Sequence, residues 1–296
     1  MELLKIFITS ISFYFYMVIY SHSRLSTFEQ CPKKFKYKYL DKLRPEIEKT
    51  IETHLGSAVH KTLEWIYNSV KEMDKDIKID EIISEYTEKW QKEFSENILI
   101  VKKQFTARDY FNKGVHFLVD YYSKHAPFKD GTIACEKGIL IELEEDGYKI
   151  QGFIDRLVYN LETGEYEIHD YKTGNLLPNQ ERLDKERQLA LYSIAIKEIY
   201  GKDREVILVW HFLAHNKTMK SKRTNSQLEN LKKETIELIK KLESVKEFPR
   251  NRSALCDWCE YKNICFKEEG EEKKIKENGN QSFNSATKEE KLDILN

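Results

Sequence analysis

The sequence predicts a single elaborated α/β domain. Segments rich in β-branched and aromatic residues alternate with longer segments whose apolar residues recur at helical spacing, and 296 residues suffice for one such domain with a sizeable core. Strands are expected at 132–143, 148–159, 165–174 and 206–213. Helices are expected from residue 26, from residue 56, and over 80–125, 184–200 and 227–248.

Composition limits how this chain could bind nucleic acid. Charged residues make up 33% of the sequence, but the 49 basic residues almost balance the 50 acidic ones. Any affinity for nucleic acid must therefore come from a local basic surface rather than from net charge.

The first sixteen residues differ from the rest of the chain. The apolar run from Ile6 to Tyr20 is shorter than the ~20 residues of a membrane span, though long enough for a signal-peptide core. Only Lys5 supplies a positive flank, and Met17 is a candidate for the natural start. We therefore treat 1–16 as an extension that is not part of the functional domain, and we expect a cytoplasmic protein without stable membrane association.

The first predicted helix carries an aromatic stripe. Phe28, Cys31, Phe35 and Tyr39 recur at helical spacing, which indicates a buried face. Several lysines surround this stripe. They mark either a basic surface near DNA, with the aromatic rings available for stacking, or an ordinary solvated face.

The second predicted helix begins at Gly56 and carries His60 on its apolar side. A lone histidine in such a position is commonly a core residue. Residues 73–130 continue as a helical insertion, which could shape a nucleic-acid channel or bind a partner. The strand 132–143 follows and carries Glu136, which is either a surface charge or a group that faces a site.

Residues 148–174 predict an antiparallel hairpin that carries the chemistry. A four-residue loop at 161–164 would place Asp155 directly opposite Asp170, with Lys172 on the same face. Two carboxylates ~5 Å apart repel each other, so the pair implies a cation such as Mg²⁺ between them. A metal ion beside an ammonium group suits phosphodiester hydrolysis. The alternative is an edge hairpin whose charges are merely solvated.

The segments after the hairpin add one polar pair and a tail. Gln188 and Tyr192 are four residues apart on the predicted helix 184–200 and share one face, a spacing that is also ordinary for a helix surface. Residues 267–296 are rich in Lys, Glu, Asn, Gln and Ser, which predicts a disordered tail.

Three cysteines form a C-x2-C-x5-C arrangement, Cys256, Cys259 and Cys265, within the segment 250–266. Three thiolates leave a fourth metal ligand missing, and Cys31 is the natural candidate. The four cysteines could hold a [4Fe-4S] cluster or a structural zinc ion. The fifth, Cys135, lies in an apolar strand and is expected to be an inert core residue.

Several motifs together resemble the PD-(D/E)xK nuclease superfamily, specifically its RecB-like and AddB-type iron-sulfur branch, and also the CRISPR-adaptation nucleases. They occur in the family's order between residues 24 and 266. The segments are Leu25–Phe35, Gly56–His60, Gly152–Arg156, Asp170–Gly174, Gln188–Tyr192 and the terminal cysteines.

This resemblance implies a restriction-endonuclease-like core over 17–266, a mixed β-sheet flanked by helices, with the helical insertion and a C-terminal [4Fe-4S] segment. His60 and the backbone carbonyl of Tyr171 would then join Asp155 and Asp170 around Mg²⁺ or Mn²⁺. The remaining site residues that it implies are Lys172 as a catalytic group, Glu136 as an accessory ligand, Gln188 and Tyr192 as a clamp on the DNA backbone or the metal-bound water, and Arg156 beside the phosphate or Asp170.

The function expected from this resemblance is that of a metal-dependent DNA nuclease, an exonuclease acting on single strands or DNA ends in repair or recombination. The alternatives are a CRISPR-adaptation-type nuclease and a non-catalytic DNA-binding subunit of a larger complex. The sequence contains no Walker phosphate loop, so a helicase activity would have to come from a partner chain.

Overall fold

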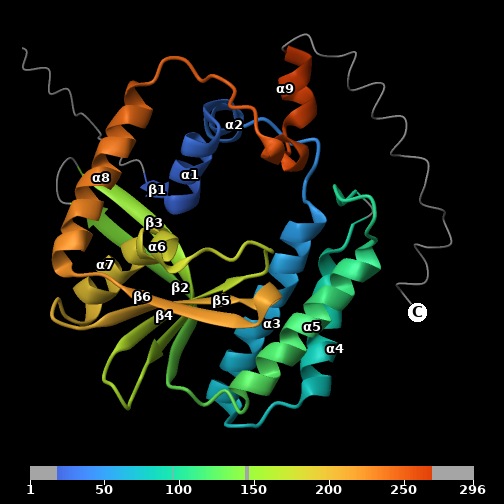
Figure 1. Ribbon diagram of the computed structural model, residues 1–296, viewed down its shortest axis with the longest axis vertical. Coiled ribbons are helices and arrows are strands. Elements are labelled where there is room, and N and C mark those ends of the chain that lie inside the picture. Colours follow the sequence, from blue (N-terminus) through green and yellow to red (C-terminus); the bar gives the residue numbers. More distant parts are fainter. Residues whose placement is uncertain (1–18, 96, 144–146, 269–296) are drawn as a thin grey trace, which may run out of the picture.

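The computed structural model describes residues 19–95, 97–143 and 147–268. It confirms the α/β class, because the described chain forms a six-stranded mixed sheet with helices on either side (Figure 1). The N-terminal extension 1–16, the tail beyond residue 268 and the turn residues 144–146 lie outside the described residues.

The strands are β1 (Ile19–Ser21), β2 (Thr132–Leu143), β3 (Tyr148–Tyr159), β4 (Tyr166–Lys172), β5 (Val206–Phe212) and β6 (Lys217–Lys222). Strand β3 pairs with three other strands. It pairs antiparallel with β2 along its length, parallel with β1 near its start and antiparallel with β4 near its end. Strand β5 continues in parallel with β4, and β6 closes the sheet antiparallel to β5.

The β3–β4 hairpin has the predicted register. The Asn160 backbone N–H donates to the Glu165 carbonyl at 2.9 Å, which encloses the four-residue loop 161–164. The Asn160 side chain accepts hydrogen bonds from the next backbone N–H groups, and Gly164 takes a positive φ of 72° that favours glycine. Pairing then runs from Tyr159–Tyr166 to Arg156–His169, and one further step places Asp155 opposite Asp170.

The helices are α1 (His22–Gln30), α2 (Pro32–Phe35), α3 (Ile51–Met73), α4 (Ile79–Glu93), α5 (Ala107–His125), α6 (Gln180–Asp184), α7 (Gln188–Tyr200), α8 (Asn225–Ser244) and α9 (Lys262–Glu268), with a π-helical turn η1 (Lys36–Leu40) and two 3₁₀ turns, η2 (Leu213–His215) and η3 (Ala254–Trp258). Helices α4 and α5 fall within the predicted insertion and pack on α3.

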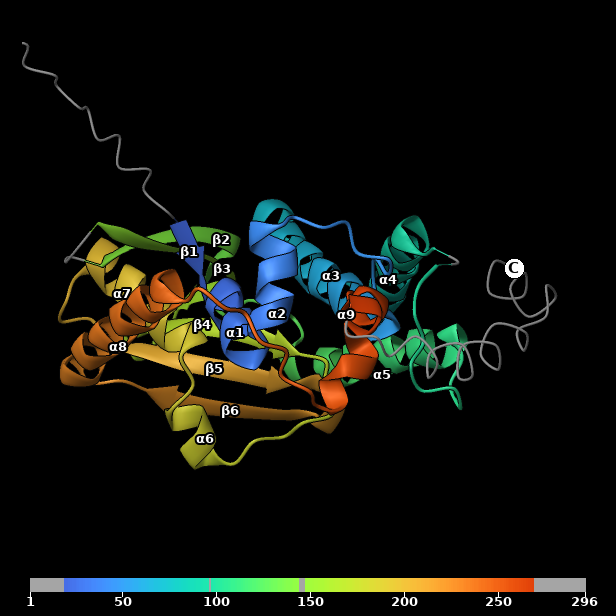
Figure 2. The same ribbon diagram turned by 90° about the horizontal axis from the view of Figure 1, so that it is seen from above.

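Two apolar cores hold the helices against the sheet. Helices α1, α7 and α8 contribute to one core, which includes Ile168 and Trp210 from the sheet. Helices α3, α4 and α5 form a layer of their own, visible at one side of the sheet in Figure 2, and their core includes Tyr171 of β4. Strand β4 therefore contributes neighbouring residues to both cores, as its alternating side chains require.

A third, small core joins segments that are far apart in the sequence. It contains Tyr37 of η1 together with Tyr261 and Cys265 near the end of the described chain. Main-chain and side-chain bonds support it, including Lys33 N–H to the Pro249 carbonyl at 3.1 Å. The sequence prediction that the early cysteine helix and the late cysteine segment lie together therefore agrees with the fold.

Among the described residues, no helix combines the length and the apolar composition needed to cross a lipid bilayer.

Candidate active site

Three ligand groups from three different elements meet beside the second half of β3. His60 of α3, Glu136 of β2 and Asp155 of β3 each offer one ligand atom, and these atoms lie within 4.8 Å of one another. No other group of three such atoms occurs among the described residues. Carboxylate oxygens with one imidazole nitrogen are a donor set that a divalent metal ion can use, so the residues present fit such an ion.

Helix α3 brings His60 to the sheet at close range. The His60 ring lies with Nε2 2.7 Å from the Tyr171 carbonyl oxygen and Nδ1 3.3 Å from Asp155 Oδ2. One turn earlier, a Cβ atom on Gly56 would be 3.3 Å from Thr173 Oγ1, a tight contact that glycine avoids. The absence of a side chain on Gly56 therefore lets α3 approach Thr173 closely.

Asp155 is fixed from the neighbouring strand. Its Oδ2 atom accepts a hydrogen bond of 3.0 Å from the Tyr171 backbone N–H. Tyr171 thus presents both of its backbone polar groups to this site, the N–H to Asp155 and the carbonyl to His60. That this carbonyl is a metal ligand stays a prediction.

Glu136, the ligand group from β2, has an unusual backbone conformation. It lies in β2 between the residues paired with Arg156 and Ile154, so it faces Asp155 across the strands. Its φ of 45° is in the left-handed region, which is rare for a residue other than glycine and costs of order 1 kcal/mol or more. The strain turns an exposed strand residue toward the site.

Asp170 and Lys172 form an ion pair beside the cluster. Asp170 is buried, and Lys172 Nζ lies 2.9 Å from its Oδ1 and 2.7 Å from its Oδ2. Only the Oδ1 contact has hydrogen-bond geometry, so Oδ2 is a buried oxygen with unused accepting capacity. Such an atom is suited to a cation.

Gln188 completes the surroundings of the ammonium group. It is the first residue of α7, and its Oε1 accepts a hydrogen bond of 3.4 Å from Lys172 Nζ. The same helix is capped by Glu186, whose carboxylate accepts from the N–H groups of Gln188 and Leu189 at 2.8 and 3.1 Å. Sequence reasoning missed Glu186, although an acidic residue just before a helix is a recognisable signal.

The charges in the site are strongly coupled. Burial raises the pKa of Asp170, and the nearby Asp155 carboxylate raises it further against the opposing effect of Lys172. Burial and Asp155 likewise raise the pKa of Glu136. For His60, burial would lower the pKa, but the hydrogen bond and charge of Asp155, with the charge of Asp170, raise it to about 9. The site therefore concentrates negative charge.

Glu64 of α3 is, after Glu186, the second acidic residue near the site that sequence reasoning missed. Glu64 follows His60 by one helical turn, and its charge raises the pKa of Glu136. The i, i+4 spacing from His60 was the available sequence signal.

Tyr192 does not have the surface position that a clamp on the DNA backbone requires. It is 5% exposed, and its ring lies against Gly152, where a Cβ atom would be 2.4 Å from Tyr192 Cε1. Burial raises the pKa of Tyr192, although hydrogen bonds with Gln188 and with the Phe153 backbone oppose that rise. Of the two motif residues, Tyr192 thus packs against β3 at Gly152, and Gln188 accepts a hydrogen bond from Lys172.

The predicted position of Arg156 is wrong. Its side chain is 1% exposed and points to the helical layer, where its guanidinium lies 4.0 Å from the ring centre of Tyr67. It therefore cannot contact a phosphate or Asp170. The cause is the strand period of two, because the residue after Asp155 must face the opposite side of the sheet.

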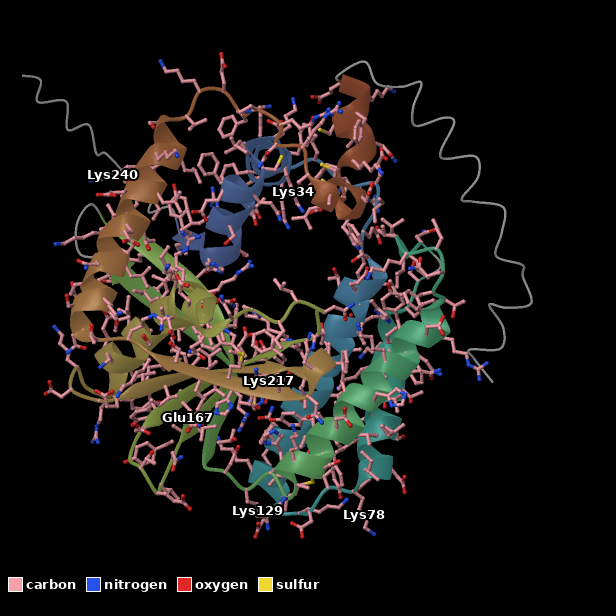
Figure 3. The ribbon with its side chains drawn as sticks, viewed as in Figure 1. Lys34, Lys78, Lys129, Glu167, Lys217 and Lys240 are labelled. Carbon is pink, nitrogen blue, oxygen red and sulfur yellow. The ribbon has the colours of Figure 1, made fainter. Side chains whose placement is uncertain are left out.

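The four predicted cluster cysteines line one small pocket, which Cys31, Cys256, Cys259 and Cys265 share with aromatic and basic residues. Lys34 of α2 lies on the side of that helix facing the C-terminal segment (Figure 3) and forms an ion pair of 2.7 Å with Glu260. Cys135 lies outside this pocket in β2, and burial raises its pKa to about 12.

The sulfur atoms are not arranged as they would be around a bound zinc ion. A tetrahedral zinc ion with Zn–S bonds of about 2.3 Å would hold its sulfur ligands about 3.8 Å apart. Among the described residues no three cysteine sulfurs lie within 4.8 Å of one another. Cysteine side chains can adopt other rotamers when a metal binds, so this spacing favours neither zinc nor an iron-sulfur cluster.

The family comparison agrees with this fold and site. The sequence model of the PD-(D/E)XK nuclease superfamily matches residues 19–266, so this chain belongs to that superfamily. A more particular likeness is to a subunit of the ATP-dependent helicase/deoxyribonuclease of Carboxydothermus hydrogenoformans, with 26% identity over 238 residues. The match covers 72% of this chain but 22% of the relative, so the chain spans under a quarter of that protein's length.

A solved structure described as the crystal structure of SSO0001 is 16% identical. It covers 79% of this chain and 93% of its own chain, with a TM-score of 0.30. A likeness of this size does not bear on function.

Proposed function

We propose that this chain is a metal-dependent deoxyribonuclease, an exonuclease that acts on single strands or DNA ends in repair or recombination. The observation that carries the proposal is the convergence of His60, Glu136 and Asp155 beside the Asp170–Lys172 ion pair. Membership of the nuclease superfamily supports the reaction class. The name of the relative supports DNA as the substrate.

In this proposal the metal is Mg²⁺ or Mn²⁺. Asp155, Asp170 and the Tyr171 carbonyl would provide oxygen ligands, His60 would provide a nitrogen, and Glu136 would be accessory. When bound, a divalent ion neutralises charge on the scissile phosphate and lowers the pKa of a coordinated water.

The protein's own contribution centres on Lys172. Burial would lower its pKa, but the charge and hydrogen bond of Asp170 raise it, so the ammonium group stays protonated. A charged, partly exposed ammonium beside the carboxylates can orient the attacking water and stabilise negative charge as it develops on the phosphate. Gln188 restricts where that ammonium can lie.

Two other functions are compatible with parts of the chain. A CRISPR-adaptation-type nuclease would use the same site for the same reaction. A non-catalytic DNA-binding subunit would need neither Asp170 nor Lys172, and the intact ion pair argues against it. A helicase partner is a further proposal, supported only by the name of the relative.

We also propose that Cys31, Cys256, Cys259 and Cys265 hold a [4Fe-4S] cluster with a structural role. The shared pocket supports one common site. Four thiolates at one site suit such a cluster, and structural zinc is the alternative.

The proposed function is tested with purified protein and DNA labelled at either the 5′ or the 3′ end. Single-stranded, double-stranded and circular single-stranded DNA are incubated with Mg²⁺, Mn²⁺ or EDTA. We expect cleavage with either metal, none with EDTA, and protection of the circle because it has no ends. The label that is released first gives the polarity.

Three variants locate the activity in the site. Asp170→Asn and Lys172→Ala should each reduce kcat at least about a hundredfold while DNA binding changes little, because both groups act on the transition state. Lys185→Ala is the control, since Lys185 is an exposed lysine paired with Glu181 on the surface. Cleavage by both site variants within tenfold of the unmodified protein would refute the assignment.

A further inference from the structure

We infer that Arg156 and the Tyr171 hydroxyl are positioning residues that hold the metal ligands from the far side of the sheet. This inference rests on the proposed function, because it concerns the same site. It gives a role to a buried charge that the proposed mechanism does not use.

Arg156 connects every element that carries a proposed metal ligand. Its Nε donates to the Tyr171 hydroxyl of β4 at 2.8 Å, and Nη1 donates to Thr132 Oγ1, the first residue of β2, at 3.2 Å. Its guanidinium also covers the Tyr67 ring of α3. Arg156 itself directly follows Asp155 in β3. One fully buried side chain thus joins β2, β3, β4 and α3.

The charge of Arg156 is balanced within the same network. Nη1 forms an ion pair with Asp130, in the loop before β2, and Nη2 lies 2.7 Å from His169 Nδ1. Because a guanidinium only donates, His169 Nδ1 must accept, and its Nε2 is then free to donate to Glu167 Oε2 at 3.0 Å. Nearly all donors have partners, so the position of Arg156 is strongly determined.

Tyr171 transmits this position to the site. Its hydroxyl accepts from Arg156 on the helical side, while its backbone N–H binds Asp155 and its carbonyl accepts from His60. A change in the tilt of the Tyr171 peptide would therefore move two proposed ligands at once.

Backbone pairing between β3 and β4 stops short of the two carboxylates. The ladder ends at Arg156–His169, one residue before Asp155 and Asp170. Beyond that point, two hydrogen bonds involving side chains join these strands: Tyr171 N–H to Asp155, and Arg156 Nε to the Tyr171 hydroxyl. Each strand still pairs with its outer neighbour, β2 or β5, so these two bonds adjust the separation of the carboxylates within that frame.

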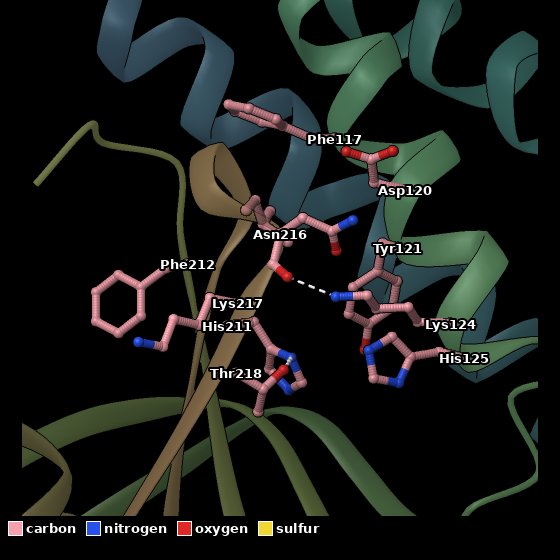
Figure 4. Close-up of a pocket in the computed structure, with 11 residues that line it drawn as sticks. Phe117, Asp120, Tyr121, Lys124, His125, His211, Phe212, Asn216, Lys217 and Thr218 are labelled. Carbon is pink, nitrogen blue, oxygen red and sulfur yellow. Dashed lines mark hydrogen bonds between the residues drawn. The ribbon is translucent and has the colours of Figure 1, made fainter. Parts of the chain in front are cut away.

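The network extends outward to a small pocket. The Tyr121 hydroxyl lies 3.3 Å from that of Tyr171 and 2.7 Å from that of Tyr67. Figure 4 shows Tyr121 and His211 among the residues around this pocket, on the side of β5 that faces α5. His211 Nε2 lies 2.8 Å from His169 Nδ1, so the buried network continues almost to the surface.

Tyr171→Phe tests the inference with the smallest change, because it removes only the hydroxyl that accepts from Arg156. We expect the affinity for Mn²⁺, measured by calorimetry without DNA, and kcat with DNA each to fall about tenfold, with KM unchanged, as for other groups that orient metal ligands. Arg156→Lys keeps the charge but loses the forked donors, and it should have a larger effect in both assays.

Tyr86→Phe is the matched control. It deletes an equally buried tyrosine hydroxyl, one that donates to the Phe111 backbone carbonyl within the helical layer and has no contact with the Arg156 network. We expect Mn²⁺ affinity and kcat within twofold of the unmodified protein, even if both tyrosine variants lower Tm equally.

Two results would overturn the inference. Mn²⁺ affinity and kcat in Tyr171→Phe equal to those in Tyr86→Phe would leave the network a purely structural role while the proposed function stands. If the unmodified protein binds no Mn²⁺, both the proposed function and the positioning role fail. A protein that binds Mn²⁺ but cleaves no DNA would refute only the proposed function, and the Mn²⁺ titrations would still decide the positioning role.

Discussion

The Tyr192 ring fills the space that a side chain at position 152 would need, and Gly152 leaves that space open. A Cβ atom on Gly152 would lie 2.4 Å from Tyr192 Cε1 and 2.6 Å from its hydroxyl oxygen. The aromatic ring of α7 thus takes the place of a side chain on β3, three residues before Asp155. Gly152, three residues before Asp155, and Tyr192, four residues after Gln188, therefore belong to two motifs that pack directly against each other.

Gly152→Ala should therefore displace the Tyr192 ring and lower the free energy of unfolding by about 1–3 kcal/mol, the usual range for overpacking a core. Urea denaturation measures this change. Gly138→Ala is the control, since a Cβ there would meet the Phe153 ring at an ordinary 3.6 Å. Adding Tyr192→Leu to Gly152→Ala should recover part of the loss, and equal stability of the two alanine variants would contradict the packing argument.

Metal affinity should depend on pH through His60. The metal-free protein holds this imidazole protonated up to a pKa of about 9, whereas a metal ligand must be neutral. Affinity for Mn²⁺ should therefore rise by up to about tenfold per pH unit between about pH 6 and 8.5, with proton release seen in buffers of different ionisation enthalpy. His60→Gln should bind more weakly but with a flatter pH dependence. An unchanged slope in that variant would remove His60 from the ligand set.

Cys31→Ser should lower iron content and Tm together, because metal binding contributes directly to folding free energy. Protein purified without oxygen should absorb broadly near ~400 nm and contain about four irons per chain. Cys135→Ser is the control, since Cys135 lies outside the cysteine pocket. A colourless protein with one stoichiometric zinc would refute the cluster and support the tetrahedral alternative.

His54→Leu should stabilise the protein in acid. His54 is fully buried, with its ring 4.3 Å from that of Trp90, and burial followed by the charge of Lys49 lowers its pKa to about 4. The unfolded chain takes up this proton near its ordinary pKa of 6.5, so stability is lost as pH falls from 6.5 toward 4. The advantage of the variant should approach about 3 kcal/mol near pH 4 and be small at about pH 8. Urea denaturation at pH 4 and pH 8 measures this difference, and an equal change in the free energy of unfolding at both pH values would contradict it.

Much of the site could be predicted because its geometry is local. The hairpin register depends on a four-residue loop with a terminal glycine, and it alone placed Asp155 opposite Asp170 and aligned Lys172 with them. The aromatic stripe of the first helix was also interpreted correctly, since Phe28 and Phe35 are buried. In both cases a simple period decides which way a side chain points.

Other features depend on tertiary contacts that no local pattern encodes. The start of the first helix is an exception, since it begins at His22 and not near Ser26 because of a local signal that was overlooked: Ser21 caps it by accepting from the Arg24 N–H. Glu136 has a positive φ within β2, between the residues paired with Arg156 and Ile154, and its local sequence does not indicate this conformation. Arg156 illustrates the same limit, since its partners come from loops and helices up to about 90 residues away.

The joining of early and late segments around Tyr37 has a consequence for biosynthesis. Tyr37 binds Glu268, 231 residues later, and Tyr20 binds Glu243, 223 residues later. At about 5–20 residues per second, roughly ten to fifty seconds separate the synthesis of the two partners. During that interval the nascent chain exposes the first helix and its cysteine without their final neighbours. Chaperones or cofactor-delivery proteins would therefore encounter this segment before the domain closes.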